Sequence, residues 1–428
     1  PLHPRYCYDR NVDYLSGASI AIKKDLFFKL GCFDNRFSPG YYEDTDLAMK
    51  VRHSGLDVRL SHLSIVIHLE GKSSVDETQG MKRFQKINKV KFLDKWSHQL
   101  SAHNYLKPDK CRHFYDRKSF KTIMFVDCFL PTPDKDSGSN DIYIAMKVCR
   151  KFGFEVIFVP TIERQSEYKY LDMLRRSGIV TYGQDPNSTP DALVRHIVKV
   201  HKPDICHISR YNNWHRFFGF IQRLSPTMKF IFDTVDLHHL RHRREAELAN
   251  SSEGIKESSK IEQAEFKAIE QAQTVLLRSS VEKKLLLDFG FNSEKLIHFP
   301  ICREIFEPAT SFEDRSGILF VGGYKHSPNI DAVVYFLSEI YPHILSRRPD
   351  VEFNIVGSHV DLLMPHISPF LPVFSGINII GFVDDIAPLM ESSRLSVAPL
   401  RYGAGTKGKV ISSICHGLPC ISTSIAVE

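Results

Sequence analysis

The sequence predicts an α/β protein with two successive doubly wound, Rossmann-like units, and two observations support this fold class. From residue 121 onwards, short β-rich apolar runs such as "TIMFVD" and "KFIFDTVD" alternate with helical stretches, a pattern typical of parallel sheets with crossover helices. A second alternating series runs through "GILFVGG", "VEFNIVGS", "LSVAPL" and "PCISTS". Ligands of such sheets bind at the carboxyl ends of the strands, so we expect a cleft between the two units.

A separate pattern precedes these units. "YLSGASIAIKKDLFFKLGCFD" indicates a strand, a helix and a turn, "DVRLSHLSIVIHLEG" alternates like strands, and "MKRFQKINKVKFLDKW" indicates a basic amphipathic helix. The following stretch shows no clear period and is interpreted as a linker. We therefore expect four segments: residues 1–97, the linker 98–120, a first Rossmann-like unit at 121–305 and a second at 306–428.

Composition is that of an ordinary globular protein, with 43% hydrophobic and 25% charged residues among 428. The net charge of +6 suits an anionic small molecule or a membrane surface, and we expect no nucleic-acid partner. Nine scattered cysteines without a C-x-x-C motif indicate free thiols in a reducing compartment. The sequence contains no run of 18 apolar residues, so we predict no transmembrane helix. The pattern begins abruptly at Pro1, and we interpret the chain as a piece of a longer cytoplasmic protein.

A glycine loop follows an apolar strand in the second unit, within "APLRYGAGTKGKVISSICHGLP". Gly403 and Gly405 let backbone N–H groups approach an anion, Lys407 and Lys409 add charge, and a helix begins next. A diphosphate would suit this loop, although a glycine-rich turn with solvated lysines is the alternative. "FVGGYKHSPNIDAV" repeats the arrangement at the first strand of that unit.

The first unit carries two further loops of interest. In "PTPDKDSGSNDIYIAM", the glycine Gly138 lies where a loop enters a helix, which suits an anion, a sugar hydroxyl or a plain helix cap. In "FDTVDLHHLRHRREAEL", Asp236 and His238 follow a strand. A histidine there can bind a sugar or phosphate, although a surface histidine in a charged helix is the alternative.

Acidic residues crowd together in "SPGYYEDTDLAMKVRHSG". Glu43 or Asp44 could cap the helix that begins there, and acids suit the positive end of a helix dipole. Local physics alone therefore favours capping over chemistry.

Residues 121–428 resemble a GT-B glycosyltransferase of family 4, the glycosyl transferases of group 1, on "PTPDKDSGS", "FDTVDLHHLRHRREAEL", "FVGGYKHSPNIDAV", "IGFVDD" and "APLRYGAGTKGKV". The resemblance implies a nucleotide-sugar donor in the second unit, an acceptor mainly in the first, and no essential metal. It also implies residue roles. Gly138 would lie near the reacting groups, and His238 would contact the transferred sugar. Lys325 would approach the diphosphate, and Phe382 and Val383 would flank the base. The remaining residues that line the donor would be Gly322, Gly323, Gly403, Gly405, Lys407 and Lys409.

One position departs from that family. Such enzymes usually carry a glutamate for the ribose hydroxyls in the helix after the glycine loop, and that place falls on Ser412. A serine cannot supply an anionic double acceptor, so donor affinity or donor identity is expected to differ.

Residues 1–95 resemble the C-terminal half of a family 2 GT-A glycosyltransferase, on "YLSGASIAIKKDLFFKLGCFD", "YYEDTDLAMKVRHSG" and "VIHLEGKSS". The resemblance implies that Asp44 is the general base with Glu43 beside it, which now favours catalysis over capping. It also implies that His68 helps hold a divalent metal, Mg or Mn, in this module only. The metal-binding acidic motif of the amino half is not in the sequence.

We therefore expect a piece of a bifunctional, hexosyltransferase-type enzyme that transfers sugar from a nucleotide-sugar to a glycan or lipid-linked acceptor in surface polysaccharide biosynthesis. It would act in the cytoplasm, with peripheral contact at the inner face of the membrane. The alternative is a non-catalytic scaffold that binds nucleotide-sugars or glycans. An NAD-dependent enzyme is disfavoured, because no G-x-G-x-x-G follows a strand with an acid about 20 residues later.

Overall fold

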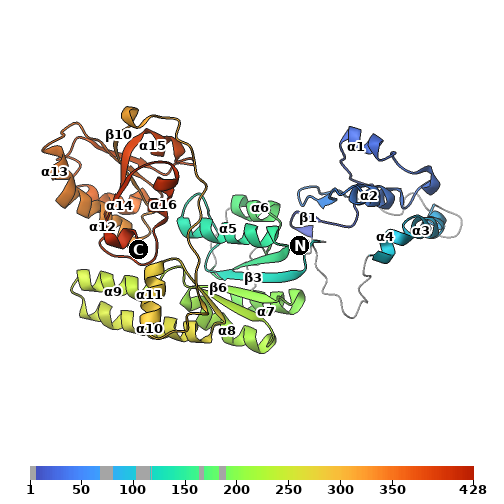
Figure 1. Ribbon diagram of the computed structural model, residues 1–428, viewed down its shortest axis with the longest axis horizontal. Coiled ribbons are helices and arrows are strands. Elements are labelled where there is room, and N and C mark those ends of the chain that lie inside the picture. Colours follow the sequence, from blue (N-terminus) through green and yellow to red (C-terminus); the bar gives the residue numbers. More distant parts are fainter. Residues whose placement is uncertain (1–5, 68–80, 103–115, 117, 163–167, 183–188) are drawn as a thin grey trace. The chain divides into compact units, whose positions relative to one another are not determined.

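A computed structural model describes residues 6–67, 81–102, 116, 118–162, 168–182 and 189–428 (Figure 1). The chain divides into two compact units, which we describe separately. Unit 1 comprises Pro1–Met124, Lys147–Val159 and Glu163–Asp204, and unit 2 comprises Phe125–Met146, Pro160–Ile162 and Ile205–Glu428. Within the described residues, no helix combines the length and the apolar character needed to cross a membrane.

The N-terminal part of unit 1 is mainly helical. Its elements are β1 (Arg10–Asn11), α1 (Lys24–Lys29), α2 (Glu43–His53), β2 (Arg59–Leu60), α3 (Arg83–Lys95) and α4 (Ser97–Ala102). The expected basic helix is confirmed as α3. A small core of Phe37, Met49, Phe92 and Trp96 joins it to α2. Helix α4 occupies the start of the stretch that we interpreted as a linker.

The strands expected in this part are largely absent. β1 and β2 form a two-residue antiparallel pair, and the alternating run beyond β2 forms no further strand up to residue 67, where the described stretch ends. Ile65 and Ile67 are 71% and 86% exposed. An alternating sequence becomes a strand only when its backbone and apolar face find a neighbour, and here the sequence pattern alone was insufficient.

Polar contacts tie this N-terminal part to the rest of unit 1. The buried ring of His62 lies between two carboxylates, with Nδ1 2.7 Å from Asp9 and Nε2 2.9 Å from Asp172 of helix α6 (Tyr168–Arg176). The buried hydroxyl of Tyr8 donates to Glu155 of strand β4 (Phe154–Pro160) at 3.0 Å. Asp172 and Glu155 are more than 100 residues from their partners in the sequence, and Asp9 is 53 residues from His62, so no local sequence pattern predicts these contacts.

The first sheet has the order β5-β4-β3-β6-β7-β8-β9, which is the doubly wound arrangement predicted from the alternating runs. The pairs β4–β5, β6–β7, β7–β8 and β8–β9 are parallel. Its remaining strands are β3 (Lys121–Asp127), β5 (Ile179–Thr181), β6 (Ile205–Ser209), β7 (Lys229–Asp233), β8 (Thr274–Leu277) and β9 (Leu296–His298). The intervening helices are α5 (Ser137–Lys151), α6, α7 (Pro190–His201), α8 (Tyr211–Leu224), α9 (His238–Leu248), α10 (Ser252–Gln271) and α11 (Ser280–Asp288).

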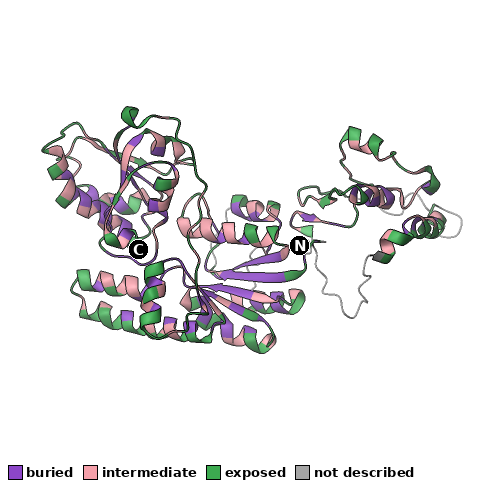
Figure 2. Ribbon diagram, in the orientation of Figure 1, coloured by how far each residue is buried: buried purple, intermediate pink, exposed green. Residues whose placement is uncertain are grey.

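The second sheet lies wholly in unit 2 and has the order β12-β11-β10-β13-β14, with all four pairs parallel. Its strands are β10 (Ser316–Val321), β11 (Phe353–Val356), β12 (Ile377–Gly381), β13 (Ser393–Ala398) and β14 (Cys420–Ser422). Its helices are α12 (Ser327–Tyr335), α13 (Tyr341–Leu345), α14 (Val360–Ile367), α15 (Ala387–Ser392) and α16 (Gly408–Cys415). Figure 2 shows that β10, β11 and β13 are mostly buried, whereas the helices expose one side.

Candidate active site

The glycine loop between β13 and α16 folds back on its own backbone. Gly403 and Gly405 have φ angles of 150° and 68°, which glycine adopts at little cost. The ammonium of Lys407 donates to the carbonyls of Ala404 and Gly405, the latter at 2.6 Å. This lysine therefore stabilises the loop itself, a role that the sequence pattern did not suggest.

The loop between β10 and α12 is joined to the glycine loop through Asn329. The side-chain amide of Asn329 donates to Gly323 O at 2.8 Å, and its oxygen accepts from Lys409 Nζ at 2.7 Å. Lys409 also lies 4.0 Å from the centroid of the Phe320 ring. Gly322 is required here, because a Cβ would approach that ring to 2.9 Å and the Asn329 side chain to 3.0 Å. Asn329 thus couples the two glycine loops.

The β3–α5 loop contributes Gly138 and its flanking serines. Helix α5 begins at Ser137, and Asp136 caps it, with the Ser139 N–H and hydroxyl donating to the carboxylate at 2.8 and 2.6 Å. Within the described part of the chain, a Cβ at Gly138 would lie within 4 Å of Asp136 alone, at 3.6 Å. The plain capping interpretation therefore belongs to Asp136, and Gly138 leaves an open approach to the helix.

The β7–α9 loop holds Asp236 and His238 in a strained backbone. Val235 has φ of 66°, a left-handed conformation that is rare for a β-branched residue and is often found at functional sites. His238 begins α9 and is 9% exposed, with its N–H donating to Glu265 of α10 at 2.8 Å and its ring Nδ1 3.0 Å from Asp236 O. Glu265 caps α9 from another helix, so His238 is not a surface histidine.

Asp236 and Glu282 face the glycine loop from the first sheet. A Cβ on Gly405 would lie 3.4 Å from Asp236 and 3.5 Å from Glu282. Glu282, at the start of α11, is fully buried and accepts from Leu237 N at 2.8 Å, and its other oxygen has no hydrogen-bond partner among the described residues. Sequence reasoning missed Glu282. The available signal was Ser279, a typical N-cap residue three positions earlier, which indicates that a helix begins there.

Burial and charge shift several pKa values around this loop. Burial lowers the pKa of Lys407 to about 8, and burial together with Lys407 lowers the pKa of Lys409 to about 7. Burial raises the pKa of Glu282 to about 8. Although burial opposes ionisation of Asp236, His238 and Arg241 hold its pKa at about 2. Around pH 7 the loop therefore carries lysines that can take up protons when an anion arrives.

The other donor-side residues are spread around the second sheet. Lys325 is exposed, as is Phe382, which follows β12 together with the half-buried Val383. Val383 packs against a cluster that includes Leu319 and Met390. Ser412 lies half-buried in the middle of α16, one turn after Gly408.

In unit 1, the acids of the "YYEDTDL" stretch lie in the first turn of their helix and do not occupy its N-cap position. Helix α2 begins at Glu43 without a side-chain cap, and Asp44 accepts from Gly17 N at 2.9 Å and from Thr45 N. Asp44 therefore satisfies one N–H of the first helical turn from within the helix, and the N-cap position itself is held by Tyr42. The preceding Tyr41 and Tyr42 both have positive φ.

A residue that sequence reasoning missed holds this turn. The buried amide of Asn88, from α3, donates to the carbonyls of Phe37 and Gly40 at 2.8 Å and of Tyr41 at 3.2 Å. His68, the expected metal ligand, lies outside the described residues. Among those described, no group of three or more His, Cys, Asp or Glu residues is arranged to hold a metal ion.

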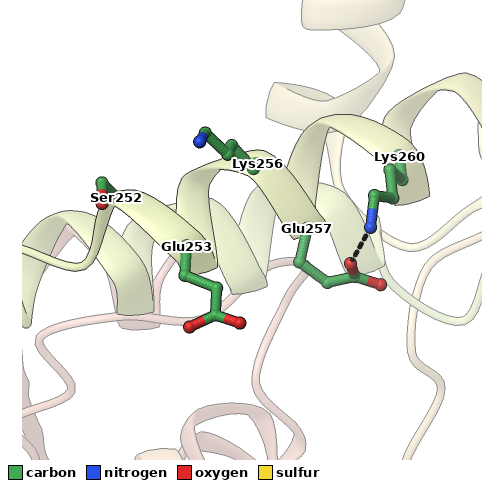
Figure 3. A pocket seen from close by; sticks show the side chains of 5 residues that line it. All are labelled: Ser252, Glu253, Lys256, Glu257 and Lys260. Carbon is green, nitrogen blue, oxygen red and sulfur yellow. Dashed lines mark hydrogen bonds and ion pairs between the residues drawn. The ribbon is translucent and has the colours of Figure 1, made fainter.

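A hollow of about 420 Å³ lies on α10, and Figure 3 shows the side chains that line it. Its lining residues all belong to that helix: Ser252, Glu253, Lys256, Glu257 and Lys260. Lys260 pairs with Glu257 at 2.9 Å. Two lysines balance two glutamates there, and none of the loops above contributes, so the hollow is not the candidate active site.

The fold and its loops define a class: an α/β protein with two doubly wound parallel sheets, as in GT-B glycosyltransferases. Residues 315–428 match the family model described as Glycosyl transferases group 1. A Klebsiella pneumoniae relative, described as an uncharacterized 44.6 kDa protein in the cps region, is 24% identical over 115 residues. That match covers 26% of this chain and 30% of the relative's length.

Two solved structures share the fold. The S. aureus TarM G117R mutant, in complex with fondaparinux, alpha-GlcNAc-glycerol and UDP, is 10% identical with a TM-score of 0.54, over 72% of this chain and 86% of that one. Sucrose-phosphate synthase from Thermosynechococcus elongatus is 14% identical with a TM-score of 0.52, over 72% and 82%. At these identities the likeness establishes the fold alone. The family match does not extend to residues 1–97.

Proposed function

We propose that residues 121–428 act as a glycosyltransferase that moves a sugar from a nucleotide-sugar donor to a glycan or lipid-linked acceptor. The observation that carries the proposal is the meeting of two loops: the Gly403–Lys409 loop of the second sheet and the Asp236–His238 loop of the first. The family match to residues 315–428 supports it. The cps-region relative supports a role in surface polysaccharide synthesis. The proposal places this activity in the cytoplasm, with peripheral contact at the membrane.

The chemistry follows from the charges at these loops. Cleavage of the bond between the sugar and the diphosphate leaves negative charge on the diphosphate, which backbone N–H groups, the start of α16 and the ammonium groups of Lys407 and Lys409 can stabilise. His238 can donate or accept a hydrogen bond at the sugar. Lys325 supplies further positive charge, and Phe382 and Val383 offer an apolar face to the base.

The alternative, a nucleotide-sugar or glycan-binding scaffold, is favoured by one observation: Ser412 replaces the acidic ribose ligand. Calorimetric titration with a panel of nucleotide-sugars, followed by an assay of donor hydrolysis, distinguishes the two functions. Binding with turnover supports the transferase, binding without turnover supports the scaffold, and no binding contradicts both.

Ser412→Glu is expected to tighten nucleotide-sugar binding by about 10- to 100-fold, because a charged hydrogen bond contributes roughly 1.5–3 kcal/mol. The measurement is the Kd of the donor that binds the unmodified protein. Ser413→Glu, one position along, is the matched control and is not expected to tighten binding, since Ser413 is buried against Ser396. Unchanged affinity in Ser412→Glu would mean that this helix position does not face the ribose.

We further propose that residues 1–97 belong to a second transferase of GT-A type, with Asp44 as base, Glu43 beside it, and His68 as a ligand of a Mg or Mn ion. The support is the sequence resemblance of this stretch and the turn before Asp44 that the Asn88 amide holds. Such a metal would neutralise the leaving diphosphate.

Asp44→Asn is expected to lower the turnover of this module by roughly 100-fold, the scale of general-base catalysis, with little change in melting temperature. The assay measures sugar transfer by a protein that also carries the amino half of a GT-A domain, in a Lys409→Met background, which isolates the measurement from the donor loop of the second sheet. Unchanged transfer combined with a lower melting temperature would assign Asp44 a purely structural role.

A further inference from the structure

Arg303 joins the segment between the two sheets to helix α5 at the candidate site. It lies in the segment that leads from β9 to β10, and its side chain is only 10% exposed. One guanidinium nitrogen, Nη1, donates to Asp141 of α5 at 2.5 Å, and the other, Nη2, donates to the Ser137 hydroxyl at 2.6 Å. Sequence reasoning passed over this residue, because nothing in "FPICREIFEP" marks it.

This guanidinium lies against the first turn of α16. Gly408 is the first residue of that helix, and a Cβ there would lie 2.0 Å from the Ser137 hydroxyl and 3.3 Å from Arg303 Nη2. Only glycine leaves room for this approach. Arg303 therefore lies at the helix end to which the glycine loop leads.

Positive charge accumulates at this place. The start of α16 carries the positive end of the helix dipole, and Lys407 and Lys409 are its immediate neighbours in sequence. Among the described residues, the carboxylate that contacts the guanidinium is Asp141, which is 9% exposed. Burial raises the pKa of Asp141 even though Arg303 opposes the shift, so ionised Asp141 is a costly counter-ion in this position.

We propose that Arg303 is a further donor-binding residue, whose guanidinium exchanges Asp141 for the diphosphate of the nucleotide-sugar held by the glycine loop. The inference rests on the proposed function of residues 121–428. A guanidinium offers two parallel N–H donors that match phosphate oxygens, and a diphosphate brings more negative charge than one carboxylate. The Ser137 hydroxyl, which accepts a hydrogen bond from Nη2, would keep the Arg303 side chain oriented during the exchange.

A matched pair of variants separates this role from a structural ion pair. Arg303→Gln and Asp141→Asn break the same ion pair, so a purely structural role predicts equal effects on binding and stability. If Arg303 binds the diphosphate, Arg303→Gln weakens binding by about 10- to 100-fold, whereas Asp141→Asn, which removes the competitor, leaves binding unchanged or tighter. Arg303→Lys keeps the charge but loses the paired donors, and we expect several-fold weaker binding.

The experiment titrates the 428-residue chain and each variant with UDP, GDP and inorganic pyrophosphate, with thermal unfolding recorded in parallel. Weaker binding in Arg303→Gln together with unchanged or tighter binding in Asp141→Asn supports the inference. Equal weakening in both variants, or unchanged affinity in Arg303→Gln, overturns it while leaving the proposed function intact. If Arg303→Gln does not fold, unchanged affinity in Arg303→Lys overturns it. Failure of the unmodified chain to bind any of the three ligands overturns the proposed function and this inference together.

Discussion

Binding of a nucleoside diphosphate is expected to weaken by up to about 500-fold as the pH rises from 7 to 9. In the free protein the pKa of Lys409 is lowered to about 7 and that of Lys407 to about 8. A bound anion favours the charged lysines and raises both pKa values, so binding takes up protons. Each lysine then weakens binding by at most tenfold per pH unit above its free pKa. Calorimetry in two buffers with different ionisation heats measures the proton uptake directly.

Arginine substitutions provide the control for this pH dependence. The guanidinium does not lose its proton in this range, so Lys407→Arg should remove the part of the slope near pH 8, and Lys409→Arg the part near pH 7. Lys284, an exposed lysine of α11, serves as the control, because Lys284→Arg should leave the slope unchanged. A flat affinity between pH 7 and pH 9 in the unmodified protein would show that neither lysine contacts the diphosphate.

Gly357→Ala is expected to lower the free energy of unfolding by more than about 3 kcal/mol, at the upper end of point-mutation effects. Gly357 follows β11 with φ of 145°, and a Cβ there would lie 1.7 Å from the carbonyl oxygen of Gly322. The obstacle is backbone, so no rotamer change can relieve it. The displaced Gly322 would also disturb the loop that Asn329 links to Lys409. Urea-induced unfolding of the unmodified protein and the variant measures the loss.

Gly381→Ala is the control for the backbone conformation alone. Gly381 ends the neighbouring strand β12 with φ of 78°, and no atom of the described residues lies within 4 Å of its Cβ position. It should therefore cost only the roughly 1–2 kcal/mol of a left-handed non-glycine residue. Equal losses in the two variants would mean that the contact with Gly322 contributes nothing.

The parallel sheets could be predicted because buried strands have a signature that is local in sequence. Runs such as "TIMFVD" and "GILFVGG" became β3 and β10, and the helices between them followed from length and polarity. Residues 57–67 show the limit of this reasoning, since they alternate equally well but form only β2. Whether such a run becomes a strand depends on a neighbour that the run itself does not encode.

The candidate site likewise contains residues that could be predicted from the sequence and residues that could not. Gly403, Gly405 and His238 could be found because glycines and a histidine after a strand are visible in the sequence. Glu282 and Arg303 could not, because their importance arises from contacts with Gly405 and Ser137, more than 100 residues away. The loop lysines were identified, but the carbonyls that hold Lys407 and the ring beneath Lys409 could not be foreseen.

A few polar bonds join the loops of the two sheets, and they affect how affinities will be measured. Glu245 of α9 accepts from Ser327 and Tyr402 at 3.1 Å, and Arg244 donates to Gly403 O at 2.7 Å. Each contributes about 0.5–1.5 kcal/mol net. A donor that must part these loops binds only the fraction of molecules in which they are open, so the apparent Kd exceeds the intrinsic one by the reciprocal of that fraction. A variant such as Tyr402→Phe, which removes one such bond, can therefore bind more tightly than the unmodified protein without gaining a contact.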